Sequence, residues 1–177
     1  MSITFAHLPA GYIACSLLYA KFEQRISSYK AYLFWGLLGS VAPDLDYYYK
    51  EMFDPSENPS HHHYFTHYPF FWLILWVLSL LWLGLNRRGQ GPVSAFVFSL
   101  GGIIHNFLDT VVGRIYWFAP FSFEKYGIVS LVRNYDPSML PDFWNWGYGV
   151  ELIITLWAVY LWSRSGRRRG SRRSAGL

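Results

Sequence analysis

An apolar run from Val93 to Val112 is long enough to cross a lipid bilayer, yet it carries a histidine and an aspartate, His105 and Asp109. Their spacing of four residues places both side chains on one face of a helix, one turn apart. A charged aspartate at the centre of a membrane helix costs roughly 2.5–3.5 kcal/mol on insertion scales, so such residues normally face a protein interior and a partner. The pair therefore indicates either a bound cation or a hydrogen-bonded pair that only ties helices together.

Four further apolar runs accompany this one, and together they predict an all-α, integral membrane bundle of about five membrane segments. Hydrophobic residues make up 53% of the 177 residues and charged residues only 15%, which is too apolar for an ordinary soluble domain. The second run is short for a hydrocarbon core, which needs about 20 residues, so the first two runs are expected to be tilted or partly sunk. The four runs are Phe5–Ala20, Ala31–Pro43, Tyr68–Leu85 and Val150–Trp162.

The segments between the runs are expected to lie at the membrane surface. Residues 47–67 are polar and rich in histidine, which predicts a loop with short helical pieces over the helix ends. Residues 113–149 are rich in Trp, Tyr and Phe, which is typical of an interfacial loop and makes this segment a candidate cover for a substrate. We expect one membrane domain over residues 1–162 and a basic, disordered tail over residues 163–177.

The basic residues predict the orientation. The tail, the segment 21–30 and the turn 86–92 hold eleven of the 15 Lys and Arg residues. If all three are cytoplasmic, the chain obeys the positive-inside rule with five membrane segments and a cytoplasmic C-terminus. The net charge of +4 then reflects membrane topology, and no nucleic acid partner is expected.

This orientation brings the ionisable residues to one level, on the extracytoplasmic side. Histidine and carboxylate without cysteine is the ligand set of hydrolytic Zn, Mn or Fe sites. We expect two or three divalent ions, most simply Zn, and an activated water that attacks phosphorus. Asp46 and Glu151 are also considered for proton transfer. The predicted metal ligands are His7, Asp44, Asp46, His62, His67, His105, Asp109 and Glu151.

Simpler roles remain open for several of these residues. His61 and His63 suit a surface position, His7 could cap a helix, and Glu151 could be a buried hydrogen-bonding group. For the whole protein, the alternatives to an enzyme are a metal carrier or sensor and a non-catalytic structural membrane protein. Transport needs a polar path across the membrane, and the inner halves of the predicted helices offer almost no ionisable groups.

Several ordered motifs resemble a family of small bacterial inner-membrane proteins described as LexA-regulated, membrane-bound, metal-dependent hydrolases. The family pattern contains Pro-Asp-x-Asp, a His-Arg-x-x-Thr-His block and His-x-x-x-Asp. In this chain His63 stands where the family has Arg, and Tyr68 stands where Ser is common. The matching stretches are His7–Gly11, Gly36–Asp46, His62–His67, His105–Asp109 and Pro120–Ser122.

The resemblance implies a metal-dependent hydrolase in the bacterial inner membrane. Our own hypothesis for the substrate is a phosphoester in a lipid or lipid-linked molecule. The resemblance also implies a distant likeness to the all-helical zinc phospholipase C arrangement, which uses a His-x-x-x-Asp helix. The replacement of Arg by His63 removes a fixed cation that could hold a phosphate group.

Overall fold

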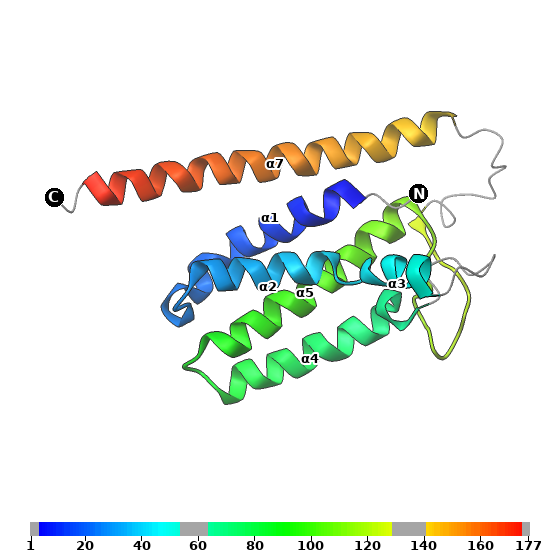
Figure 1. Ribbon diagram of the computed structural model, residues 1–177, viewed down its shortest axis with the longest axis horizontal. Helices are drawn as coiled ribbons and strands as arrows, with labels where there is room; N and C mark the ends of the chain where they lie inside the picture. Colours follow the sequence, from blue (N-terminus) through cyan, green and yellow to red (C-terminus); the bar gives the residue numbers. More distant parts are fainter. Residues whose placement is uncertain (1–3, 54–63, 129–140, 175–177) are drawn as a thin grey trace.

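The computed structural model describes residues 4–53, 64–128 and 141–174, and helices dominate these ranges (Figure 1). The one β-type pairing among the described residues is an isolated bridge between Ile115 and Tyr126. The predicted all-α class is therefore confirmed. The long helices are α1 (Thr4–Phe22), α2 (Tyr29–Val41), α4 (Pro69–Leu85), α5 (Gln90–Val112) and α7 (Pro141–Ser174).

Three shorter helices connect or follow the long ones. The 3-10 turn η1 (Glu23–Arg25) joins α1 to α2, helix α3 (Leu45–Phe53) follows α2, and the 3-10 turn η3 (Phe65–His67) precedes α4. By length and composition, one described helix, Gln90–Val111, is able to cross a membrane by itself. Pro69–Leu85 is apolar but shorter.

Helix α5 lies at the centre of the bundle, where it packs against α1, α2 and α4, while α7 packs against α1 (Figure 1). Glycines permit the closest approaches between the backbones of α2 and α5. A Cβ atom on Gly39 of α2 would lie 2.0 Å from the carbonyl oxygen of Phe98, and one on Gly101 would lie 2.7 Å from the amide nitrogen of Ser40. Small residues of this kind let membrane helices pack backbone to backbone.

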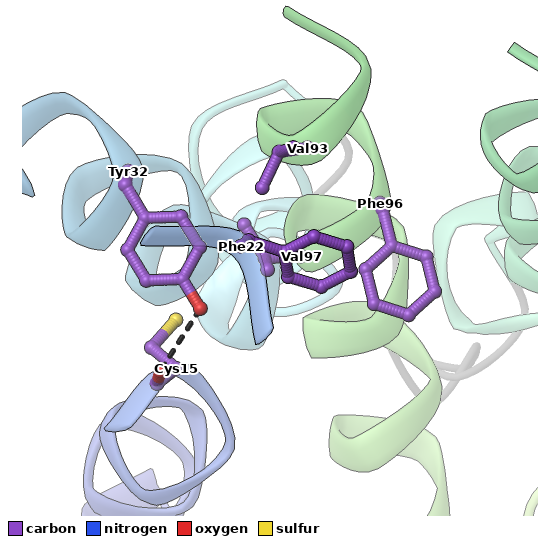
Figure 2. Packing of buried hydrophobic residues seen from close by; sticks show 6 residues of the cluster. All are labelled: Cys15, Phe22, Tyr32, Val93, Phe96 and Val97. Atoms are coloured by element: carbon purple, nitrogen blue, oxygen red, sulfur yellow. Dashed lines mark hydrogen bonds between the residues drawn. The ribbon is translucent and has the colours of Figure 1, made fainter. Parts of the chain in front are cut away.

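The apolar core lies in the half of the bundle formed by the first turns of α5. Figure 2 shows its buried side chains, in which the hydroxyl group of Tyr32 donates a 2.9 Å hydrogen bond to the carbonyl oxygen of Cys15. The apolar core thus lies on the side of the bundle where α5 begins, away from His105 and Asp109 near the end of that helix. The core consists of Cys15, Phe22, Tyr32, Val93, Phe96 and Val97.

The structure agrees with one sequence-based expectation and differs from another. Helix α3 and the turn η3 are short helical pieces of the kind predicted over residues 47–67. Helix α7 begins at Pro141 and continues to Ser174, into the segment expected to be disordered. Once a helix is established, each further residue adds one hydrogen bond, and Arg is a good helix former, so the basic segment extends α7.

Candidate metal centre

Helix α5 carries His105 and Asp109 into the bundle, where their exposed fractions are 0% and 2%. The Nε2 atom of His105 lies 3.2 Å from Oδ2 of Asp109. On the other side of the ring, Nδ1 of His105 lies 2.9 Å from the carbonyl oxygen of Ser40, to which it can donate a proton. This hydrogen bond would orient the ring and leave the Nε2 lone pair available, as in metal-binding histidines.

The carbonyl group of Ser40 is available because α2 ends at Val41. The last carbonyl groups of a helix have no donor within that helix. The amide of Asp44 bonds to the carbonyl oxygen of Val41 instead of that of Ser40. The close contact between α2 and α5 at Gly39 and Gly101 then brings the Ser40 carbonyl to the histidine ring.

Two carboxylates follow α2, and they approach opposite sides of the His67 ring. Oδ1 of Asp44 lies 3.7 Å from Nε2 of His67 and 3.6 Å from Nε2 of His105. Oδ2 of Asp46 contacts Nδ1 of His67 and accepts a 2.6 Å hydrogen bond from the hydroxyl group of Thr66. Asp46 therefore orients His67 from behind, whereas Asp44 lies on the side where the Nε2 atoms converge.

His67 lies at the end of η3, where the indole of Trp72 fixes the turn by donating a 2.6 Å hydrogen bond to the carbonyl oxygen of Thr66. Burial lowers the pKa of His67, but the carboxylates of Asp44 and Asp46 outweigh burial and raise this pKa to about 9. Burial likewise raises the pKa of Asp44, but the neighbouring imidazoles of His67, His105 and His7 together outweigh burial and lower that pKa. A metal ion at Nε2 of His67 must displace a proton, so binding weakens as the pH falls.

Helices α1 and α7 approach the cluster from a third side. His7 of α1 is fully buried, and its Nε2 atom lies 3.4 Å from Oδ1 of Asp109. Its ring stacks on that of His105 with a centroid distance of 3.8 Å and an interplanar angle of 20°. Glu151 of α7 is half-buried and interacts electrostatically with His7.

The spacing of the donor atoms fits a divalent metal ion. Neighbouring atoms in the set Asp44 Oδ1, His67 Nε2, Asp109 Oδ2 and His105 Nε2 lie 3.2–3.7 Å apart. Nitrogen and oxygen ligands about 2.0–2.1 Å from a tetrahedral zinc ion are about 3.3–3.4 Å from one another. Two groups, His7 with Asp44 and His105, and His67 with His105 and Asp109, each have their ligand atoms within 4.8 Å of one another.

The hydrogen bonding of the cluster supports the same interpretation. Nε2 of His105 and both carboxylate oxygens of Asp109 are buried and have no hydrogen-bond partner among the described residues. Buried polar atoms without partners are costly, and a bound cation would satisfy them. Because imidazole and carboxylate are the donors, Zn, Mn and Fe are the candidate metals.

Most of the predicted ligands meet in this cluster, but not all of them face its centre. Asp46 contacts His67 from behind, and Glu151 interacts electrostatically with His7 but joins neither group of ligand atoms. His62 falls outside the described residues together with His61 and His63. The sequence carries no signal for Ser40, since it acts through its backbone carbonyl. The predicted residues that the structure brings together are His7, Asp44, His67, His105 and Asp109.

Comparison with known proteins places the chain in a membrane context. Residues 1–169 match the family described as YdjM inner membrane protein. No curated protein and no solved structure matches the chain. The family match covers every residue of the cluster, and it agrees with the predicted location in the inner membrane.

Proposed function

The chain belongs to the YdjM inner membrane protein family, and on this premise we propose that it is a metal-dependent hydrolase of phosphoester bonds in a lipid or lipid-linked substrate. The observation that carries this proposal is the buried cluster of three imidazoles and two carboxylates whose donor atoms lie at metal-ligand spacing. A bound divalent ion supplies two things there: it lowers the pKa of a water towards about 7, and it polarises the phosphoryl oxygen.

Other residues of the chain would set the direction from which the substrate approaches, position His67 and accept a proton. The side chain of Asp44 is 16% exposed, while those of His67 and Asp109 are 0% and 2% exposed, so a substrate would approach from the side of Asp44. Asp46 is engaged by His67 and would position that ring rather than accept a proton. Glu151 is half-buried and interacts electrostatically with His7, and it is left as the carboxylate that would take the proton of the attacking water.

The outer surface of the bundle supports the proposal that five helices lie in the bilayer. A soluble protein rarely exposes a large contiguous apolar surface, whereas lipid tails cover such a surface at no cost. The short α2 would then be tilted or only partly sunk, as the sequence predicts. Exposed apolar side chains include Leu73, Ile74, Val77, Leu78, Leu81 and Leu85 on α4, and Leu152, Ile153, Leu156 and Val159 on α7.

Contacts at the end of the bundle opposite the cluster support the proposed topology. The guanidinium group of Arg25 donates to the carbonyl oxygen of Asn86, and the side chain of Gln90 bonds to Ser27 and Ser28. The loop after α1 and the loop after α4 therefore lie together, as the basic residues of both predict for the cytoplasmic face. The metal cluster would then lie at the extracytoplasmic face.

The segment after α5 supports a lipid substrate. Phe118, Phe121 and Phe123 are 58%, 79% and 57% exposed. Phe121 packs against the start of α4, close to η3, and the exposed Lys125 lies 5.0 Å from the ring centroid of Tyr116. Exposed aromatic rings beside a basic residue suit the headgroup level of a membrane, where they would contact an anionic lipid.

The apolar core argues against a metal carrier. Its six side chains, which Figure 2 shows, include no carboxylate, imidazole or basic group. An ion that left the cluster in the direction of this core would meet, among these six side chains, only the Cys15 thiol and the Tyr32 hydroxyl as possible ligands. Hydrolysis at one membrane face suits the observed distribution of polar groups better than transport across the membrane.

The proposal predicts metal-dependent release of products from phospholipid vesicles. Purified protein in vesicles of phosphatidylethanolamine and phosphatidylglycerol, supplied with Zn²⁺ or Mn²⁺, should release a phosphate-containing fragment that mass spectrometry detects. Chelation should stop the release and metal should restore it. In cells, a chelator that cannot cross the membrane should inhibit right-side-out spheroplasts and spare inverted vesicles. If wild-type protein releases no more product than Asp109→Asn with either metal, hydrolysis of these lipids is ruled out.

A further inference from the structure

The two oxygens of the Asp109 carboxylate face different imidazoles. Oδ2 lies 3.2 Å from Nε2 of His105 and 3.6 Å from Nε2 of His67. Oδ1 lies 3.4 Å from Nε2 of His7. A carboxylate with this surrounding can bind two cations at once, one through each oxygen.

The stacking of His7 on His105 excludes one shared ion for both rings. An imidazole binds a metal with a lone pair that lies in the plane of the ring, about 2.0–2.1 Å from the nitrogen. Two rings with a centroid distance of 3.8 Å and an interplanar angle of 20° lie in separate, nearly parallel planes. An ion in the plane of His105 therefore lies outside the plane of His7, so His7 needs a position of its own.

The remaining donors are sufficient for this second position. One ring nitrogen of His7 and one carboxylate oxygen of Asp44 lie within 4.8 Å of each other, in a group that also includes His105. Oδ2 of Asp44 is buried and has no hydrogen-bond partner among the described residues. His7, Asp44 and Oδ1 of Asp109 make three protein ligands. Three protein ligands and a water are typical of catalytic zinc, whereas four protein ligands are typical of a closed position.

We propose that the centre holds two divalent ions bridged by the carboxylate of Asp109. The closed position consists of Asp44, His67, His105 and Oδ2 of Asp109. The open position consists of His7, Oδ1 of Asp109 and the second oxygen of Asp44, and it carries the water that attacks the substrate. This inference rests on the proposed metal centre, and it assigns the hydrolytic water to the side of His7 and Glu151.

A manganese-loading experiment tests the inference without any assay of activity. Wild-type protein loaded with Mn²⁺ in detergent should hold about two ions per chain, and its electron paramagnetic resonance spectrum should show the exchange coupling of a pair about 3.5–4 Å apart. His7→Ala should hold about one ion and lose the coupling, because only the open position needs His7. His7→Asn, which keeps a polar group, should behave in the same way if the alanine variant folds poorly.

Two controls separate loss of a ligand from loss of packing. Tyr12→Phe removes the 3.5 Å contact between Tyr12 of α1 and Ser165 of α7 and should keep both ions. Glu151→Gln should also keep both ions, because our proposal gives Glu151 the role of proton acceptor and places it in neither metal position. One ion in the wild type, or two coupled ions in His7→Asn, would overturn the inference. Hydrolysis with one ion would leave the proposed function standing, and two ions without hydrolysis would leave only this inference standing.

Discussion

Replacing either His105 or Asp109 by alanine is expected to remove most of the bound metal, with a loss of affinity greater than about 100-fold, the upper range for residues that only support a ligand. Both residues supply donor atoms to the same ion in our account. The double variant should therefore lose little more than either single variant, because residues that act as a unit are strongly non-additive. Metal per chain after equilibration with a chelating buffer measures the effect.

The alternative interpretation of this pair predicts a different pattern. If His105 and Asp109 only tie helices together, each single change leaves a buried polar group unpaired and lowers the melting temperature, while metal content does not change. An apolar double replacement would then be tolerated better than either single change. Ser99→Ala is the matched control, because Ser99 is a buried polar residue on the same helix whose hydroxyl group lies 3.2 Å from that of Ser79. It should retain full metal content.

The second large effect is expected from Gly39→Ala, which adds one methyl group between α2 and α5. Its Cβ atom would lie 2.0 Å from the carbonyl oxygen of Phe98, and backbone atoms cannot turn aside as a flexible side chain can. The two helices must separate, which is expected to cost about 3 kcal/mol or more, at the upper end for overpacking. The separation also withdraws the Ser40 carbonyl from His105, so metal binding should fall together with stability.

The matched control for this change is Gly84→Ala on α4, where a Cβ atom meets nothing within 4 Å. Alanine is about 1 kcal/mol better than glycine inside a helix, so this variant should be as stable as the wild type or slightly more stable. Melting temperature in detergent and metal per chain, measured on both variants, test the prediction. If Gly39→Ala has the melting temperature and the metal content of the wild type, the contact between Gly39 and Phe98 does not position the site.

The sequence was sufficient to predict the helices and the face of α5 that lies in the His/Asp cluster. Apolar runs locate the five long helices to within a few residues, except at the two ends of α7. The spacing of His105 and Asp109 places them together because the helical period is local. The loops that contain Arg25 and Asn86 lie together, which agrees with the prediction from their positive charges that both face the same side of the membrane.

The role of each carboxylate could not be predicted in the same way. Asp44 and Asp46 are two residues apart, and only the path of η3 decides which of them lies behind the His67 ring. The Ser40 carbonyl depends on where α2 ends and on glycine contacts between helices distant in the chain. The orientation of the His7 side chain toward Oδ1 of Asp109 likewise depends on how α1 packs against α5. These are tertiary contacts, which local patterns do not encode.

The most direct test of the central claim is X-ray absorption at the metal edge of purified protein from which any affinity tag has been removed. Our account predicts bound metal with nitrogen and oxygen ligands, multiple scattering typical of imidazole, and no sulfur, since Cys15 lies in the apolar core. The imidazole signal should be lost in His105→Ala. Metal-free protein after equilibration with Zn²⁺ or Mn²⁺, or bound metal without an imidazole signal, would contradict the account.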